Sequence, residues 1–269
     1  KVNEARRRQG LKVPPMTYHM VFTGNPGTGK TTVARIVARA FRSLGIAKRG
    51  QLVEVDRSGL VGRYAGETAQ KTNQMVDSAL GGVLFVDEAY QLVSGDNDDY
   101  GKEAIATLLK RMEDNRDDLI VIAAGYTDEM RDFLDANSGL RSRFARTIEF
   151  ADYTAPELAM IFRSMAKKNQ FRLSPELDAG LGDAIAKLTR RRDRTFGNAR
   201  FVRQLFEDAT GRQANRLAAA GTLEGEALAT LLLDDLGLKE KKEDVRAPSL
   251  DEVLAEHRAR HDIAVRQHR

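Results

Sequence analysis

The sequence has no cysteine among its 269 residues, which excludes disulfides, thiolate metal sites and a cysteine nucleophile. It also has no apolar run long enough to cross a bilayer, because its longest apolar stretches, such as residues 83–86, are the size of strands. Neither a signal peptide, an internal repeat nor a low-complexity segment is visible. These absences favour a cytoplasmic globular protein without membrane insertion. Because the chain begins at Lys1 rather than at a methionine, we expect it to be a fragment of a longer protein.

The excess of basic residues is small. The formal net charge is +4, and residues of opposite sign alternate along most of the chain. Such interleaving is typical of a solvated surface, whereas a nucleic-acid-binding surface concentrates its basic residues. We therefore do not expect a nucleic acid as partner.

Short apolar segments alternate with helical stretches between about residues 18 and 150, the pattern of a parallel sheet flanked by helices. Strands are predicted at 19–23, 52–55, 83–86, 119–124 and 147–150. The later sequence is helical, with Pro156 and Pro175 in the first turn of two helices and a further helix at about 198–219. We divide the chain into the end of an N-terminal helix (1–15), an α/β domain (16–152), a small all-α domain (153–236) and a charged linker with a C-terminal helix (237–269).

A glycine-rich loop follows the first predicted strand and precedes a helical pattern. Residues 24–31 fit G-x-x-x-x-G-K-[ST], the phosphate-binding loop, in the context that this motif requires. Its glycines let backbone N–H groups turn around a phosphate, Lys30 reaches the β- and γ-phosphates, and the Thr31 hydroxyl is a ligand for Mg²⁺. No Asn-Lys-x-Asp guanine signature is present, so we expect ATP. Its predicted binding residues are Asn25, Pro26, Gly27, Thr28, Gly29, Lys30, Thr31 and Thr32.

Two carboxylates, Asp87 and Glu88, directly follow the strand predicted at 83–86. The carboxyl ends of parallel strands form the ligand site of such sheets, so both acids are expected near the γ-phosphate. Asp87 is predicted to hold Mg²⁺, and Glu88 to polarise the attacking water. After the next strand, Tyr126 or Thr127 occupies the place where a polar side chain helps to position that water. A plain strand-end turn is the alternative for both segments.

Three arginines are further candidates. Arg141 and Arg143 precede the last predicted strand, and we favour Arg143 as an arginine finger that enters a neighbouring subunit's site, with Arg141 as its support. Pairing with surface acids is the alternative. Arg200 follows Gly197 at the start of a helix, where a cation is slightly unfavourable, and it is predicted to contact the γ-phosphate of its own subunit.

An aromatic residue lies in a glycine-flanked loop between the two nucleotide motifs. Tyr64, with Ala65 and Gly66, follows the second predicted strand, and Gly62 precedes it. Such a loop packs poorly but suits a mobile gripping element. A tyrosine that merely anchors the loop to the surface is the alternative.

Together these residues resemble the AAA+ ATPases, and residues 18 to about 217 resemble the CbbX/CfxQ group. That group includes red-type Rubisco activases, the sporulation protein SpoVK and the ATPase domain of EccA proteins. The segments that carry the resemblance are 24–32, 64–72, 81–90, 124–126, 139–144 and 197–200. A tyrosine at position 126 is normal for this group.

The resemblance implies an AAA+ P-loop sheet followed by a small helical lid. It also implies a hexameric ring that pulls a protein client through its centre, with Tyr64, Ala65 and Gly66 as pore loop. One departure is that only residues 1–10 remain of the segment that helps to enclose adenine. Residues 247–255 resemble the lead-in to such a unit, which suggests one unit of a tandem array.

Two other functions were weighed. An AAA+ DNA-processing ATPase, such as a helicase loader or branch-migration motor, also has motifs like residues 140–144, and the basic cluster 190–194 could contact phosphates. No winged-helix or helix-turn-helix module follows the lid, however, which disfavours it. A nucleotide-gated scaffold that scarcely hydrolyses ATP does not need Glu88.

Overall fold

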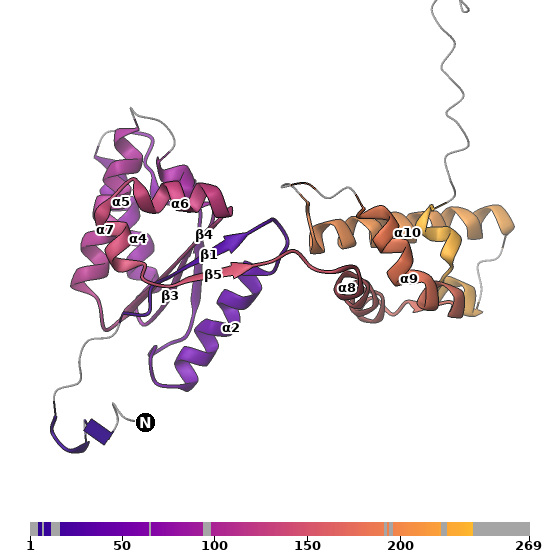
Figure 1. Ribbon diagram of the computed structural model, residues 1–269, viewed down its shortest axis with the longest axis horizontal. Coiled ribbons are helices and arrows are strands. Elements are labelled where there is room, and N and C mark those ends of the chain that lie inside the picture. The colour runs from indigo at the N-terminus through magenta and orange to yellow at the C-terminus, as the bar shows by residue number, and fades with distance from the viewer. Residues whose placement is uncertain are drawn as a thin grey trace, which may run out of the picture.

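A five-stranded parallel sheet is the centre of the N-terminal part of the chain (Figure 1). The structure is a computed structural model and describes residues 5–6, 8–11, 17–64, 66–93, 98–190, 193, 196–221 and 225–238. The strands are β1 (Met20–Gly24), β2 (Leu52–Val55), β3 (Gly82–Val86), β4 (Leu119–Gly125) and β5 (Thr147–Phe150), in the order β2-β3-β4-β1-β5. Every neighbouring pair is parallel. All five predicted strands are confirmed, each within one residue of its bounds.

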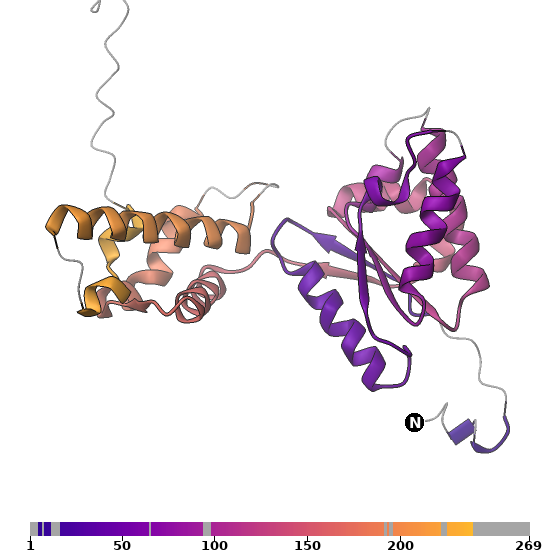
Figure 2. The same cartoon turned by 180° about the vertical axis from the view of Figure 1, so that it is seen from behind.

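Helices cover both faces of the sheet (Figures 1 and 2). Helix α2 (Lys30–Ser43) covers one face. The other face is covered by α4 (Glu67–Ala79), α5 (Asp99–Asp114), α6 (Thr127–Asp135) and α7 (Ser138–Arg143), with α3 (Arg57–Leu60) and the 3-10 helix η1 (Ala89–Val93) as connections. Successive strand residues point to opposite faces, so Val21 packs toward α4–α7 while Phe22 packs toward α2. Burial on both faces explains the unbroken apolar runs in the sequence.

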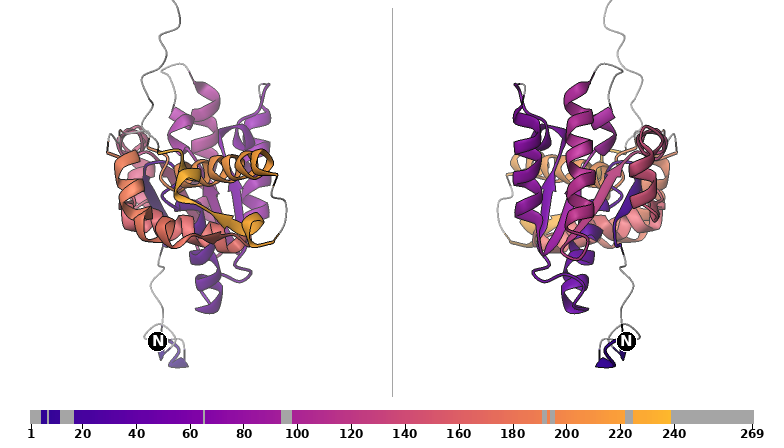
Figure 3. Two further views of the ribbon diagram at one scale, coloured as in Figure 1. Left: turned by 90° about the vertical axis from the view of Figure 1, so that its right-hand side faces the viewer. Right: turned by 90° about the vertical axis from the view of Figure 1, so that its left-hand side faces the viewer.

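A second hydrophobic core lies within the helical part. Figure 1 shows this part at one end of the sheet, and the end-on views of Figure 3 show it in front of the sheet or behind it. Its helices are α8 (Ala155–Lys168), α9 (Pro175–Leu188) and α10 (Ala199–Ala220), with the small elements β6 (Arg172–Leu173), η2 (Gly225–Ala229), β7 (Thr230–Leu231) and η3 (Leu233–Leu236). Phe162, Leu181 and Val202 are fully buried there. The predicted helix starts are confirmed: Thr154 and Glu157 form a capping box, and the Ser174 side chain caps α9.

Some predictions concern residues that the structure does not describe. These are the linker and terminal helix within 239–269, the pore-loop residue Ala65, most of the 1–15 segment, and Arg191, Arg192 and Arg194 of the basic cluster. Of the helices in the described ranges, none combines the length and hydropathy that a transmembrane span requires.

His19 is a buried base at the start of β1. Its Nδ1 atom accepts a hydrogen bond from the N–H of Val121 at 3.0 Å, and its ring lies edge-on to Phe144. Burial, assisted by the positive charge of Arg143, lowers the pKa of His19 from 6.5 to about 4. The neutral imidazole is therefore the form that the fold accommodates.

Stability should fall on acidification because of His19. The unfolded chain binds a proton at His19 below pH 6.5 and the folded chain only near pH 4, so the stabilisation is complete above pH 6.5 and is lost between these values. The loss reaches at most about 3 kcal/mol. His19→Asn keeps an acceptor but does not titrate, so urea unfolding at pH 7 and pH 5 should give a smaller pH effect in this variant. Equal pH effects in both proteins would contradict the assignment.

Candidate active site

The loop between β1 and α2 wraps around the position expected for phosphates. Gly24, Gly27 and Gly29 all have positive φ angles, which side-chain-bearing residues rarely adopt. The Lys30 ammonium donates to the carbonyl oxygens of Gly24 at 2.7 Å and Asn25 at 3.0 Å. Phosphate oxygens are acceptors that can replace these two carbonyls.

Asp87 and Glu88 lie at the carboxyl end of β3, as predicted. The N–H of Asp87 donates to the carbonyl of Val55 in β2, and its carboxylate accepts the N–H of Glu88 at 3.1 Å. Glu88 has φ 50°, a conformation that costs a non-glycine residue energy and is concentrated at functional sites. The backbone of Glu88 is thus held in a strained conformation directly after β3, at the carboxyl edge of the sheet.

The electrostatics connect the two motifs. Burial lowers the pKa of Lys30, while the negative charges of Asp87 and Glu88 oppose that shift. Burial, followed by repulsion from Asp87, raises the pKa of Glu88, while Lys30 and Arg200 oppose it. These four side chains therefore lie within each other's electrostatic reach. A carboxylate with a raised pKa is a better proton acceptor, which suits a group that polarises water.

Tyr126 belongs to the same neighbourhood. Burial, and then the charge of Glu88, raises the pKa of its phenol, and its ring packs at 5.9 Å from the ring of Tyr90. The phenol is thus close enough to Glu88 to respond to its charge. Placement of the attacking water by Tyr126 stays a prediction.

The phosphate loop also contacts the helical part of the chain. The carbonyl of Gly27 accepts the N–H of Ala199 at 3.2 Å, and the hydroxyl of Tyr153 donates to the carbonyl of Thr28 at 3.0 Å. A Cβ atom at Gly27 would lie 2.2 Å from the carbonyl oxygen of Gly197. The N-terminus of α10, which carries Arg200, therefore rests directly on the loop.

Asn198 is the centre of this contact. It is fully buried, and its amide nitrogen donates to Asp152 at 2.7 Å and to the carbonyl of Pro26 at 3.3 Å. Its amide oxygen accepts the N–H of Tyr153 at 2.9 Å. Asp152 also accepts from the Asn25 side chain at 2.9 Å. Asn198 has φ 46°, so these bonds hold it in a conformation that it would otherwise avoid.

The partners that the two candidate finger arginines contact lie outside the phosphate loop and the acidic pair after β3. Arg143 approaches Glu113 at 3.3 Å and the carbonyl of Gly139 at 3.4 Å, and its Nε atom is buried without a partner among the described residues. Arg141 is exposed and pairs with Asp135. Both thus contact acids of their own chain, as in the alternative interpretation, and the finger role stays a prediction.

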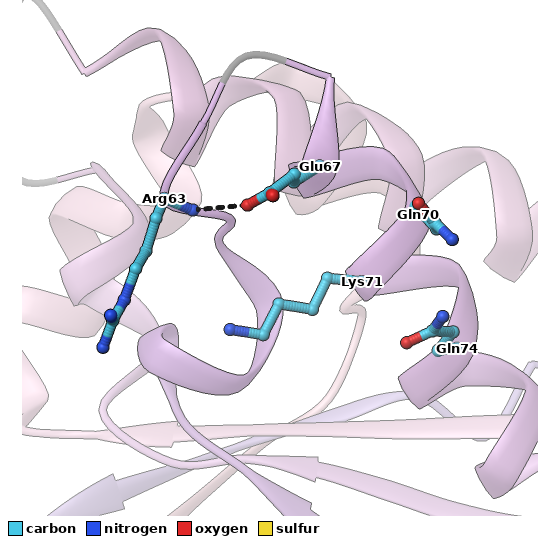
Figure 4. Close-up of a pocket in the computed structure, with 5 residues that line it drawn as sticks. All are labelled: Arg63, Glu67, Gln70, Lys71 and Gln74. Atoms are coloured by element: carbon cyan, nitrogen blue, oxygen red, sulfur yellow. Dashed lines mark hydrogen bonds between the residues drawn. The ribbon is translucent and has the colours of Figure 1, made fainter.

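Tyr64 is exposed and follows Arg63, whose backbone N–H donates to the Glu67 carboxylate as drawn in Figure 4. Tyr64 as a whole residue is 70% exposed, while the Glu67 carboxylate accepts hydrogen bonds from the backbone N–H groups of Arg63 at 3.1 Å and Tyr64 at 3.2 Å. Lys71 donates to the carbonyls of Ser58 and Val61. An open pocket of about 370 Å³ lies beside this loop and is lined by the stems and polar ends of Arg63, Glu67, Gln70, Lys71 and Gln74. The surface-anchor interpretation of Tyr64 does not fit so exposed a ring.

Comparison with known proteins identifies the family. The description "ATPase family associated with various cellular activities (AAA)" matches residues 20–152, and the AAA lid domain matches residues 154–246. Protein CbbX of Cereibacter sphaeroides is 48% identical over 238 residues, which cover 87% of this chain and 76% of that protein. This chain belongs to the AAA+ ATPases. The resemblance to the CbbX/CfxQ group is confirmed.

Two further relatives support the same placement of this AAA+ chain. Stage V sporulation protein K of Bacillus subtilis is 44% identical over 241 residues, covering 89% of this chain and 75% of that protein. The chloroplastic ribulose bisphosphate carboxylase/oxygenase activase of Cyanidioschyzon merolae is 48% identical over 219 residues, which cover 81% of this chain and 74% of that protein. Among solved structures, the FIGL-1 AAA domain in complex with ADP has a TM-score of 0.61 at 18% identity, covering 96% of this chain and 82% of that one. That likeness concerns the fold alone.

The AAA+ site has the donors that a nucleotide-bound Mg²⁺ ion requires. Thr31 and Asp87 offer hydroxyl and carboxylate oxygens, the hard ligands that Mg²⁺ prefers. Within the described ranges, no group of three or more histidines, aspartates or glutamates gathers as a metal-binding cluster. Thr31 and Asp87 fit an ion whose remaining ligands are phosphate oxygens and water, and their role as Mg²⁺ ligands stays a prediction.

Three residues of this AAA+ site were missed by sequence reasoning: Asp152, Tyr153 and Asn198. Asp152 and Tyr153 come after β5 with only Ala151 between, and Asp87 likewise follows a strand end, so the strand-end rule offered a signal for them. For Asn198 the sequence offered a weaker signal, because asparagine adopts a positive φ more readily than most residues do.

Proposed function

We propose that this AAA+ ATPase is a ring-forming, hexameric motor that couples ATP hydrolysis to the remodelling of a protein client. The observation that carries the proposal is the exposed ring of Tyr64 on a braced loop between the two nucleotide motifs. An exposed aromatic residue on a loop anchored to the ATPase core suits contact with a polypeptide. The relatedness to a Rubisco activase supports a protein as client. We place the activity in the cytoplasm, where ATP is available.

Each role in the proposed reaction is assigned to particular residues of this chain. Lys30 and the backbone of the phosphate loop bind and orient the triphosphate. Thr31 and Asp87 would hold Mg²⁺, which would supply positive charge to offset the negative charge that develops on the phosphates. Glu88 polarises the attacking water. Arg200 senses the γ-phosphate from the lid of the same subunit, while Arg143 acts on the site of a neighbour. The internal contacts of Arg143, at 3.3 and 3.4 Å, are long for hydrogen bonds, and the proposed role requires its guanidinium to leave them.

ATP hydrolysis per subunit should rise with protein concentration as rings assemble. If Arg143 completes a neighbour's site, Arg143→Ala should lower the rate of the assembled protein about tenfold or more. The measurement is phosphate release across a concentration series, with size followed by light scattering. Arg131→Ala is the matched control, because Arg131 is an exposed arginine that pairs with Asp128 one helical turn away. A flat rate that is insensitive to Arg143→Ala would contradict the shared-site ring.

A further inference from the structure

Arg57 forms a partly buried polar junction shortly before the Tyr64 loop in the chain, with 29% of its side chain exposed. It is the first residue of α3, and its guanidinium binds the Asp98 carboxylate with both terminal nitrogens, at 2.5 and 3.0 Å. One of these nitrogens also donates to the carbonyl of Gln91 at 2.7 Å. The Asp98 side chain is only 11% exposed. Such two-pronged, charge-assisted contacts fix geometry more strictly than a single hydrogen bond.

The junction connects the Glu88 segment to the rest of the site. Gln91 lies in η1, which begins directly after Glu88, and its N–H donates to the Glu88 carbonyl at 2.9 Å. Asp98 caps the N-terminus of α5 through the N–H of Gly101. Hydrogen bonds therefore run from the backbone of Glu88 through Gln91 to Arg57, and from there to α5.

The other side of the junction is the root of the Tyr64 loop. Helix α3 is tied to α4 by Lys71, which donates to the carbonyls of Ser58 and Val61, and by Thr72, which donates to the carbonyl of Leu60. Leu60 itself is fully buried. A shift of Arg57 would thus carry α3 and the start of the loop with it.

The residues around the Arg57 guanidinium are closely packed. A Cβ atom at Gly101 would lie 2.2 Å from the carbonyl oxygen of Leu92, 2.6 Å from the Asp98 carboxylate and 3.0 Å from the Arg57 guanidinium. Helix α5, η1 and α3 therefore meet at van der Waals distance around one guanidinium. A contiguous, tightly packed set of hydrogen bonds is the physical arrangement that can transmit a local change.

We propose that Arg57 is a positioning residue that couples the nucleotide state at Glu88 to the position of the Tyr64 loop. The inference rests on the proposed function, in which ATP turns over at Glu88 and Tyr64 contacts the client. Asp98 and the carbonyl of Gln91 are the two contacts through which Arg57 acts. Loss of the junction uncouples the loop without removing any group that touches ATP.

The test uses a single fluorescent reporter. The chain contains no tryptophan, so Tyr64→Trp introduces the sole indole at the tip of the loop. In this protein the fluorescence anisotropy should differ between ADP and a non-hydrolysable ATP analogue. Adding Arg57→Gln or Asp98→Asn should reduce that difference at least fivefold, while binding of a fluorescent ADP stays within twofold. Arg57→Lys, which keeps the charge but not the two-pronged contact, should restore part of it.

A conservative variant and a matched control make the reporter experiment decisive. Asparagine caps helices as well as aspartate does, so Asp98→Asn breaks the ion pair while α5 keeps its cap. Arg111→Gln is the matched control, because Arg111 joins α4 and α5 through Asn73 and Asp77 without contacting the loop. A full nucleotide response in both Arg57→Gln and Asp98→Asn would overturn the coupling alone. No response in the reporter protein itself would overturn the gripping role of Tyr64, and the coupling with it.

Discussion

Glu88→Gln should reduce ATP turnover at least about 100-fold while ATP still binds. Glutamine has nearly the same shape as glutamate but cannot accept a proton from the attacking water. Glu88 lies beside Asp87 and within electrostatic reach of Lys30 and Arg200, and its pKa is raised chiefly by burial. The substitution also removes one of two adjacent negative charges, so ATP affinity should be unchanged or higher. Steady-state phosphate release and binding of a fluorescent ATP analogue measure the two effects separately.

Two further variants serve as controls for Glu88→Gln. Glu129→Gln is the matched control, because Glu129 is a nearby carboxylate on α6 whose charge also contributes to the raised pKa of Glu88. It should keep most of the turnover. Lys30→Ala should lose ATP binding and turnover together, because it removes the ammonium that reaches the phosphates. Near-normal hydrolysis by Glu88→Gln would assign the water-polarising role to another residue.

The sheet and the catalytic edge were predictable because their signals are local and periodic. Parallel strands buried on both faces give apolar runs such as 83–86, and the polar residue after each run must lie at the carboxyl edge. This rule located Asp87 and Glu88, and the phosphate-loop motif located Lys30. The positions of these residues depend on backbone topology, which the sequence pattern encodes well.

The contacts that organise the site were not predictable in this way. Asn198 meets Pro26 across 172 positions of sequence and Asp152 across 46, and Arg57 meets Asp98 across 41. Single polar residues in loops and at helix ends carry no periodicity, so their partners become known only when the packed structure brings them together. The same holds for Arg143, whose pairing with Glu113 depends on how α7 packs against α5.

Gly27→Ala should weaken nucleotide binding at least about 30-fold, equivalent to about 2 kcal/mol. Gly27 has φ 70°, and an added Cβ would collide with the carbonyl of Gly197 and the backbone N–H groups of Ala199 and Arg200. The N-terminus of α10 must then move off the phosphate loop and take Arg200 with it. Titration with a fluorescent ADP measures the affinity, and small-angle scattering should show an increased radius of gyration as the lid is displaced.

Gly45→Ala is the control that separates the steric collision expected in Gly27→Ala from the effect of backbone strain. Gly45 has nearly the same φ, 68°, but an added Cβ there meets nothing within 4 Å. It should cost about 1 kcal/mol of folding stability and leave nucleotide affinity and the radius of gyration unchanged. Asn198→Ala approaches the same contact from the lid side, because it removes the donors to Pro26 and Asp152 without altering the loop. If Gly27→Ala weakens binding while Asn198→Ala does not, the loop acts alone and the lid contact has no part in holding nucleotide.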